Sequence, residues 1–235
     1  MSNLFFRGHL GLGDHIVCNG LFRVLHEKHD KSIIPVKRHN RHSVERMFQD
    51  LSDVVVIPVI NDFEADVYTK NYTSFGHNVV TLGHYGKEFM KDASTFDESF
   101  YNQAEVDYQA RWDNFYYPPD KERETLAYSE FCKRIGSDEY IFVHDDETRG
   151  LQINEDNLPD LPAVRPDHKF GTAGKISFFD YGLLLRNATE IHCMDSSFAL
   201  FADHLDTSDV KRKVIHRYLR RENLNPRYKD DWEIM

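Results

Sequence analysis

The chain has 235 residues, of which 40% are hydrophobic and 29% are charged, and its formal net charge at pH 7 is -10. Such a composition is typical of a folded globular protein, and the length suits one larger α/β domain or two small ones. The negative charge argues against a general nucleic-acid partner, because neutralising phosphates needs clustered Lys and Arg side chains.

Strand and helix signals alternate through the first third of the chain. Apolar runs predict strands at residues 3–6, 32–36, 54–60 and 78–82, and apolar residues at helical spacing predict helices at residues 16–25, 41–51 and 65–70. Pro58 indicates that the third strand ends early or lies at a sheet edge, because proline donates no backbone hydrogen bond. The alternation predicts a doubly wound α/β lobe.

A glycine-rich turn at residues 7–14 joins the first strand to the first helix. Gly11 and Gly13 allow a ligand to approach the backbone, and the amino end of a helix favours an anion. Asp14 is then either a helix cap or a carboxylate aimed into a cleft. A dinucleotide fingerprint would need glycine in place of Ile16, and a P-loop would need Gly-Lys-Ser/Thr. A turn that serves only packing is the structural alternative.

The segment 83–117 is unusually aromatic. It contains Tyr85, Phe89, Phe96, Phe100, Tyr101, Tyr108, Trp112, Phe115, Tyr116 and Tyr117. These rings either fill a core, since aromatic side chains bury large areas, or stack against a sugar ring. Pro118 and Pro119 then end the preceding structure before a predicted helix at residues 122–135. We therefore predict a boundary between two lobes near residues 115–138.

The strand signal returns at residues 140–143 and again at 189–194 and 213–218, with helices predicted at 178–185 and 198–205 and irregular chain at 154–174. A polar run that includes His144 and Arg149 follows the first of these strands. Ligands bind outside the carboxyl ends of strands in open α/β sheets, so this run is placed for function. A solvated acidic loop is the alternative.

A second strand-to-helix junction carries Asp195, Ser196 and Ser197. Asp and Ser are preferred helix caps, so capping alone explains them. Alternatively, their hydroxyls and the free N–H groups of the helix bind a nucleotide diphosphate without a metal, with His192 and Arg149 as further donors. No HExxH or CxxC spacing occurs, so no zinc site is expected.

Together, the two junctions resemble the GT-B glycosyltransferases, especially the heptosyltransferase-like group. The resemblance rests on Gly11-Leu12-Gly13-Asp14 near one end and on Tyr181 to Leu185, Ala188, His192, Asp195, Ser196 and Ser197 near the other. It implies two Rossmann-like lobes with a cleft between them, in a compact microbial or viral form. The proposed base of the group falls on Asp14. The group's Asp-Ser-Gly-Pro-x-His motif is matched here only by its first two residues.

The resemblance implies a function for each lobe. Residues 1–117 form an acceptor lobe, and residues 118–235 form a donor lobe in which His144, Arg149, His192, Asp195, Ser196 and Ser197 hold the nucleotide sugar. The expected enzyme moves a hexosyl or pentosyl group from a UDP- or GDP-linked sugar to a glycan hydroxyl, with inversion and without a metal or other cofactor.

Two other functions remain open from the residues. Asp145, Asp146 and Glu147 follow a strand and suit Mg²⁺ or Mn²⁺, as in a metal-dependent GT-A-like transferase. A non-catalytic nucleotide- or glycan-binding module would keep the diphosphate loop and would not need Asp14.

The cellular location is expected to be the cytoplasm. Three widely separated cysteines, Cys18, Cys132 and Cys193, do not form a disulfide framework, which favours a reducing compartment. The N-terminus lacks the pattern of a secretory leader. No run approaches the roughly eighteen apolar residues of a membrane span.

Overall fold

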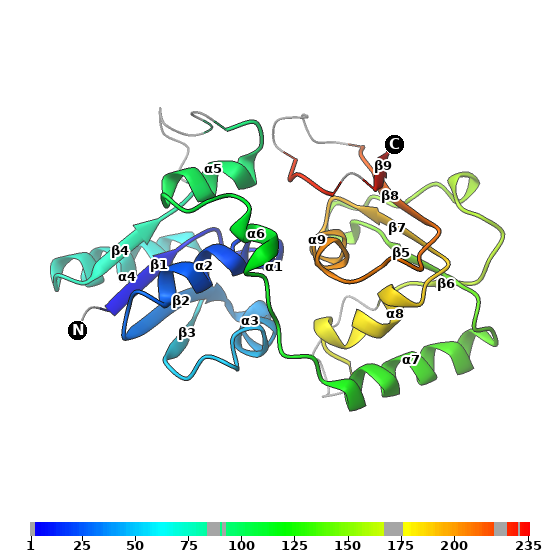
Figure 1. Cartoon of the computed structure of the whole chain (residues 1–235), viewed down its shortest axis with the longest axis horizontal. Helices are drawn as coiled ribbons and strands as arrows, with labels where there is room; N and C mark the ends of the chain where they lie inside the picture. The colour runs from blue at the N-terminus through cyan, green and yellow to red at the C-terminus, as the bar shows by residue number, and fades with distance from the viewer. Residues whose placement is uncertain (1–2, 84–89, 91–92, 167–175, 219–224, 230) are drawn as a thin grey trace. The chain divides into compact units, whose positions relative to one another are not determined.

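The computed structural model describes the chain except for residues 1–2, 84–89, 91–92, 167–175, 219–224 and 230 (Figure 1). The chain forms two compact units. The first contains Met1–Pro118 and Arg221–Arg227, and the second contains Pro119–Arg220 and Tyr228–Met235. The predicted division into residues 1–117 and 118–235 did not include this return of the chain to the first unit, of which residues 225–227 are described.

The first unit contains a four-stranded parallel sheet in the order β3-β2-β1-β4. The strands are β1 (Asn3–Arg7), β2 (Lys31–Lys37), β3 (Val54–Val59) and β4 (Asn78–Thr81). β1 and β2 are apolar on both faces and almost entirely buried, as expected of central parallel strands. β3 lies at the edge, where Pro58 costs few hydrogen bonds, as the sequence predicts.

Helices and one short 3-10 turn connect these strands or follow the last of them. They are α1 (Leu12–Val17), α2 (Asn19–His26), η1 (Arg38–Asn40), α3 (Arg41–Met47), α4 (Asp62–Ser74), α5 (Phe96–Gln103) and α6 (Ala110–Asp113). α4 is much longer than the helix predicted at residues 65–70. Its N-cap is Asn61, whose side chain accepts a hydrogen bond from the N–H of Glu64.

The predicted first helix is divided into α1 and α2 at Cys18. In an uninterrupted α-helix, the N–H of Leu21 would donate to the carbonyl of Val17. Here the Tyr101 hydroxyl donates to the Val17 carbonyl at 2.9 Å and accepts from the Leu21 N–H at 3.2 Å. A side chain inserted into the hydrogen-bond ladder is a recognised cause of a helix break. The periodicity of residues 16–25 gave no sign of it.

Part of the aromatic segment serves packing. Phe100, Tyr101 and Tyr117 are buried, whereas Tyr116 is exposed. Tyr85 and Phe89 lie outside the described residues. The buried location of Phe100 and Tyr101 supports the core interpretation for these two rings.

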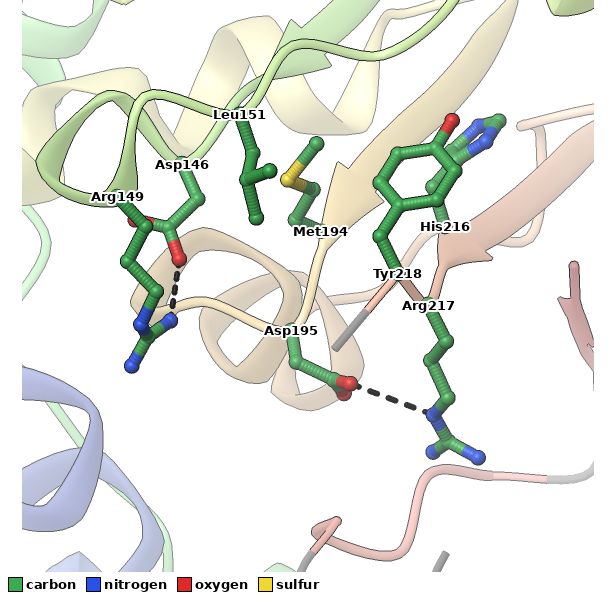
Figure 2. Close-up of a pocket in the computed structure, with 8 residues that line it drawn as sticks. All are labelled: Asp146, Arg149, Leu151, Met194, Asp195, His216, Arg217 and Tyr218. Atoms are coloured by element: carbon green, nitrogen blue, oxygen red, sulfur yellow. Dashed lines mark hydrogen bonds and ion pairs between the residues drawn. The ribbon is translucent and has the colours of Figure 1, made fainter. Parts of the chain in front are cut away.

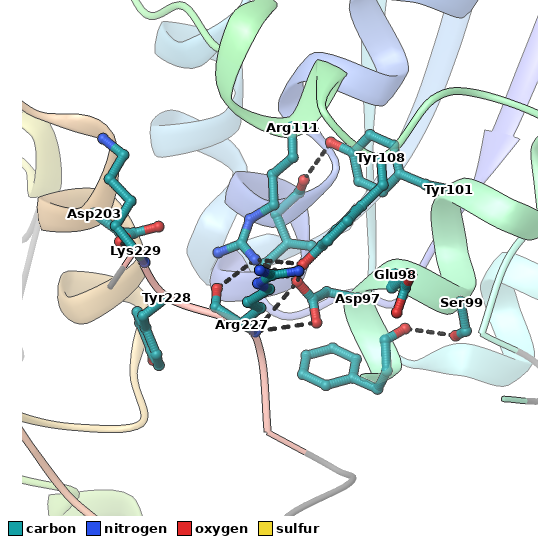
Figure 3. Close-up of polar contacts among 12 residues, drawn as sticks. Asp97, Glu98, Ser99, Tyr101, Tyr108, Arg111, Asp203, Arg227, Tyr228 and Lys229 are labelled. Carbon is teal, nitrogen blue, oxygen red and sulfur yellow. Dashed lines mark hydrogen bonds and ion pairs between the residues drawn. The ribbon is translucent and has the colours of Figure 1, made fainter. Parts of the chain in front are cut away.

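A buried ion pair lies beside these rings in the first unit (Figure 3). Asp97 and Arg111 are both 0% exposed and form a salt bridge, and Tyr108 donates to Asp97 at 2.5 Å. Arg111 also donates to the main-chain carbonyl of Arg227 at 2.6 Å, and the N–H of Arg227 lies 3.3 Å from Asp97 Oδ1. The pair therefore holds the returning C-terminal segment on the first unit.

The second unit contains a five-stranded parallel sheet in the order β6-β5-β7-β8-β9. The strands are β5 (Ile141–His144), β6 (Ala163–Val164), β7 (Glu190–Met194), β8 (Arg212–His216) and β9 (Trp232–Ile234). The helical elements are α7 (Lys121–Ile135), α8 (Gly182–Arg186), α9 (Ser197–His204) and the 3-10 turns η2 (Glu147–Arg149), η3 (Glu155–Asn157) and η5 (Phe178–Tyr181). β6 and β9 were not predicted, because two and three residues are too short to show a periodicity.

The two faces of this sheet are covered differently. Helices α7, α8 and α9 lie on one side (Figure 1), where Phe142 packs against Phe198 and Tyr181. On the other side, Ile141, Val143 and Met194 pack against the irregular segment after β5, which contributes Leu151, Ile153, Leu158 and Leu161. Within the described residues, no helix has the length and apolar character needed to cross a membrane. The predicted α/β class with parallel sheets is confirmed.

Gly20→Ala should destabilise the first unit. A Cβ at this position would lie 2.0 Å from the main-chain carbonyl oxygen of Ala110, where α2 and α6 touch. Backbone cannot rotate away as a side chain can, so we expect the free energy of unfolding to fall by about 1–3 kcal/mol. Thermal or denaturant unfolding measures it. Gly8→Ala is the control, because its Cβ would lie 3.4 Å from Phe6. Equal stability of the two variants would contradict the close approach.

Candidate functional site

A pocket in the second unit lies at the carboxyl ends of β5, β7 and β8 (Figure 2). Its lining consists of Asp146, Arg149, Leu151, Met194, Asp195, His216, Arg217 and Tyr218. Two carboxylates and two guanidinium groups thus line a space whose walls also include apolar side chains. The carboxyl edge of a parallel sheet is the usual position for a ligand in an α/β fold.

Each carboxylate of the pocket is paired with one arginine. Asp146 forms a salt bridge with Arg149, and Arg217 Nε lies 3.3 Å from Asp195 Oδ2 (Figure 2). The Asp195 side chain is nearly buried, and its Oδ1 accepts a hydrogen bond from Tyr228 at 3.2 Å. Asp195 therefore fixes Arg217 and Tyr228 in place. Half of the Arg149 side chain is exposed, so its guanidinium is accessible to a ligand.

The sequence analysis missed Arg217. Arg217 follows β8 directly, whereas a short loop separates Arg149 from the end of β5. The available signal was its position at the end of an apolar run. A short cationic run such as the one that begins at Arg217 is usually a solvated face, so the sequence alone does not single out this residue.

Ser196 has a structural role that is compatible with ligand binding. It is the N-cap of α9, and its Oγ accepts from the N–H of Ala199 at 3.4 Å. His144 Nδ1 lies 3.0 Å from the same oxygen, so the structure brings His144 and Ser196 together. Ser197 is the first residue of α9. Two loops predicted separately thus meet at the amino end of one helix.

His192 does not lie where the sequence analysis expected a diphosphate donor. Its side chain is fully buried in β7, with Nε2 2.9 Å from Glu190 Oε2 and Nδ1 3.1 Å from His216 Nε2. Burial lowers its pKa, although Glu190 opposes that shift. A buried ring with both nitrogens engaged has no donor to offer a ligand, which corrects the expectation.

The acidic run after β5 is divided between two partners. Asp145 accepts from the N–H of Ile153 at 2.8 Å and forms a salt bridge with Arg165, whereas Asp146 pairs with Arg149. The described part of the chain holds no group of three His, Cys, Asp or Glu side chains arranged to hold a metal ion. The cluster expected for a GT-A-like metal site is therefore not assembled among these residues.

In the first unit, the glycine-rich loop follows β1 and places Asp14 in the third position of α1. Gly11 is the N-cap and makes no side-chain capping hydrogen bond, so Asp14 is not the N-cap of this helix. Gly13 occupies the second position. A Cβ at Gly11 would lie 2.6 Å from Asp14 Oδ2, which shows how closely the carboxylate folds back over the loop. Only glycine leaves it that space.

His9 lies next to this carboxylate. Its Nδ1 is 3.7 Å from Asp14 Oδ1, and its Nε2 is 2.8 Å from the main-chain carbonyl of Gly83. A carbonyl can only accept, so Nε2 carries a hydrogen and the other nitrogen faces Asp14. Gly83 has a φ of +73° and no room for a Cβ beside the ring. The loop after β4 therefore sets the position of His9, and the His9 ring lies beside the Asp14 carboxylate.

The fold is similar to that of two solved glycosyltransferases. No protein-family model matches the sequence, and no curated protein matches it significantly. The glycosyl transferase family 9 structure from Veillonella parvula aligns with a TM-score of 0.61 at 10% identity, over 100% of this chain and 86% of that one. The Escherichia coli ADP-heptose LPS heptosyltransferase II aligns with a TM-score of 0.54 at 13% identity, over 100% of this chain and 90% of that one. The chain therefore has a GT-B-like fold.

Acid should destabilise the protein through His216. Burial, followed by the nearby His192 and Arg212, lowers the pKa of His216 from 6.5 to about 4, against the opposing charge of Asp145. Between these pH values the unfolded chain binds a proton that the folded protein does not, so stability falls as the pH decreases from 6.5 to 4.

Between pH 6.5 and pH 4 the His216→Gln variant should lose less unfolding free energy than the wild type. The difference between the two losses should be at most about 3 kcal/mol, since each pKa unit corresponds to about 1.4 kcal/mol. Denaturant unfolding at several pH values measures the difference. Because other groups titrate in the same range, the comparison with the wild type is decisive. Identical pH dependence in both proteins would contradict the assignment.

Proposed function

We propose that the chain is a glycosyltransferase that moves a hexosyl or pentosyl group from a nucleotide-diphosphate sugar to a glycan hydroxyl, with inversion and without a metal. The observation that carries this proposal is the pair Arg149 and Arg217 at the carboxyl edge of the second sheet, close to the capped amino end of α9. The similarity in fold to two glycosyltransferases supports it. Three free cysteines support a cytoplasmic location.

The second unit supplies the groups that a leaving diphosphate requires. When the bond between the anomeric carbon and the diphosphate oxygen breaks, its electron pair goes to that oxygen and negative charge develops there. Arg149 and Arg217 carry permanent positive charges, and their aspartate partners limit the conformations they can adopt. Fixed cations at the position of developing charge stabilise a transition state more than mobile water does.

The first unit supplies the base in this proposal. Asp14 removes the proton of the acceptor hydroxyl while the acceptor oxygen bonds to the anomeric carbon from the face opposite the diphosphate. One displacement of this kind inverts the configuration at that carbon. His9 contacts the Asp14 carboxylate, and Gly11 leaves room for it beside the loop. His9 is a positioning residue in this scheme.

A nucleoside diphosphate should stabilise the protein in the presence of EDTA. Ligand at about a hundred times its dissociation constant should add about 2.7 kcal/mol of stability. Thermal shift against UDP, GDP, ADP and CMP measures it, and we expect UDP or GDP to give the largest shift. Arg217→Gln should weaken binding about tenfold, because it removes one charge-assisted hydrogen bond.

Arg212→Gln is the matched control for this experiment. It removes the same charge from the opposite end of β8, where Arg212 pairs with Glu233. Nucleotide affinity should stay near that of the wild type. A requirement for Mg²⁺ or Mn²⁺ would support the metal-dependent alternative, and equal effects of the two variants would remove Arg217 from the binding site.

Asp14→Asn should reduce sugar transfer by about two to four orders of magnitude, the usual contribution of a positioned base. The change keeps the size of the side chain and removes the proton acceptor. Nucleotide affinity and the thermal midpoint should change little, because the donor groups lie in the second unit. Transfer assays with a nucleotide-sugar panel measure the first, and thermal shift measures the others.

Gly11→Ala gives an independent check on the position of Asp14. Its Cβ would displace the carboxylate while leaving Asp14 chemically intact. Transfer should fall although the base is still present. Near-normal transfer by a well-folded Asp14→Asn protein would rule out this base, and nucleotide binding without any transfer by the wild type would favour a non-catalytic module.

A further inference from the structure

His9 and Asp14, in the loop and helix that follow β1, face each other across a gap. His9 Nδ1 lies 3.7 Å from Asp14 Oδ1, which is beyond hydrogen-bonding distance. His9 Nε2 donates to the main-chain carbonyl of Gly83 at 2.8 Å, so Nδ1 of the neutral ring is an acceptor, as is each carboxylate oxygen. Two acceptors repel each other and keep such a gap. The pair is therefore one proton short of a hydrogen bond.

The histidine is held with Nδ1 toward Asp14. A Cβ on Gly83 would lie 2.3 Å from His9 Nε2, so the ring fits against the loop after β4 only because residue 83 is glycine. The Gly83 N–H donates to Gln103 Oε1 at 3.0 Å, which ties that loop to α5. The ring also contacts Phe100 of the same helix in an edge-to-face arrangement, with centroids 5.4 Å apart. A histidine with one nitrogen fixed by a carbonyl presents the other as a directed base.

Stability does not explain this arrangement. The His9 and Asp14 side chains are 29% and 24% exposed, and an ion pair so accessible to water contributes little to stability. Glycine flanks the pair on both sides, since a Cβ at Gly11 would meet Asp14 and a Cβ at Gly83 would meet His9. Glycine loses more conformational freedom on folding than any other residue. Its presence at both positions indicates that the placement of the pair serves function.

We propose that His9 takes from Asp14 the proton that the acceptor hydroxyl gives up. This inference rests on the proposed function, because it continues the step in which Asp14 is the base. In that step the acceptor oxygen loses its proton to Asp14 and bonds to the anomeric carbon, and the bond from that carbon to the diphosphate oxygen breaks with its electron pair.

The proton then moves from Asp14 to His9 Nδ1. The pair becomes an imidazolium that donates a hydrogen bond to a carboxylate, which closes the gap between the two side chains. Because both side chains are partly exposed, the proton passes to water when the product leaves. In this scheme His9 acts through Asp14.

A histidine improves proton removal because of its basicity. An ordinary aspartate side chain has a pKa of about 3.9, and an ordinary histidine has one of about 6.5. A base is most effective when its pKa lies near the working pH. A proton shared by a carboxylate and an imidazole is therefore held more firmly at neutral pH than a proton on a carboxylate alone.

His9→Gln separates this role from support of the loop. The glutamine amide can still donate to the Gly83 carbonyl, but it has no basic nitrogen to turn toward Asp14. We expect kcat for sugar transfer to fall about ten- to a hundredfold, which is part of the usual contribution of a positioned base. KM for donor and acceptor should stay near the wild-type values, because the change affects the transition state alone.

His29→Gln is the matched control. His29 lies in the same unit, and its Nδ1 also bonds to a main-chain carbonyl, that of Leu25, at 2.7 Å. Its other nitrogen lies 3.0 Å from the side chain of Asn78, at the start of β4 and thus at the opposite edge of the sheet from Asp14. Transfer by this variant should stay within about twofold of the wild type. Thermal midpoints establish that both variants fold.

A double variant tests whether His9 acts through Asp14. His9→Gln combined with Asp14→Asn should transfer sugar at the rate of Asp14→Asn alone, because without the carboxylate no proton reaches His9. Two independent effects would multiply instead. Imidazole added to His9→Ala should restore part of the lost transfer, whereas imidazole added to Asp14→Asn should restore none. A residue that only supports the loop would give neither result.

Nitrogen-15 NMR of the histidine rings tests the geometry without turnover. In the free protein, the neutral His9 ring should carry its hydrogen on Nε2, and Nδ1 should give the signal of an unprotonated nitrogen. The His9→Gln spectrum assigns these signals. A neutral ring with its hydrogen on Nδ1 would overturn the inference. So would equal effects of His9→Gln and His29→Gln, or multiplying effects in the double variant.

Failure of the proposed function gives a different pattern. Nucleotide binding is measured in parallel on the same proteins. Absence of nucleotide binding or of transfer by the wild type would overturn the transferase and this proton path together. Transfer by the wild type that His9→Gln leaves unchanged would overturn the proton path alone.

Discussion

Parallel pairing is the constraint on which the rest of the structure depends. All described strand pairs in both sheets are parallel, so the chain must return to the same starting edge after each strand. All loops that follow strands therefore gather at one edge of each sheet. In the first unit this edge carries the Asp14 loop and Gly83. In the second unit it carries the loops of Arg149, Ser196 and Arg217.

Buried charges hold the irregular parts of the chain to this framework. The Asp97–Arg111 pair is inaccessible to solvent, and taking two charges out of water is costly unless their remaining hydrogen-bonding capacity is used. Tyr108 and the main chain of Arg227 use part of it. An apolar pair of the same size could pack between α5 and α6. It could neither donate a hydrogen bond to the carbonyl of Arg227 nor accept one from its N–H. The ion pair thus gives the C-terminal segment a specific place on the first unit.

Several residues that look functional in the sequence instead position others. Arg7, in the glycine-rich stretch, binds Asp62 and Asp66 and so attaches α4 to β1. Asp195 holds Arg217 and Tyr228. Motif positions of this kind are informative even when their side chains only orient other groups, because one of the groups that they orient, Arg217, is the one proposed to bind the donor.

The sequence by itself determined the features that depend on neighbouring residues. Apolar spacing located seven of the nine strands in the described part of the chain, Pro58 marked the edge strand, and the turn glycines located the Asp14 loop. α7 begins with the Asp120 cap and ends at Gly136, whose φ of +72° suits glycine, so both ends follow from local backbone chemistry.

Tertiary structure alone decided the features that join residues distant in the chain. Tyr101 divides the first helix from 80 positions away along the chain. His192 is buried against a histidine of the next strand, and Asp195 fixes the position of Arg217. No local pattern encodes such contacts, because they depend on which strands become neighbours and on where each strand ends.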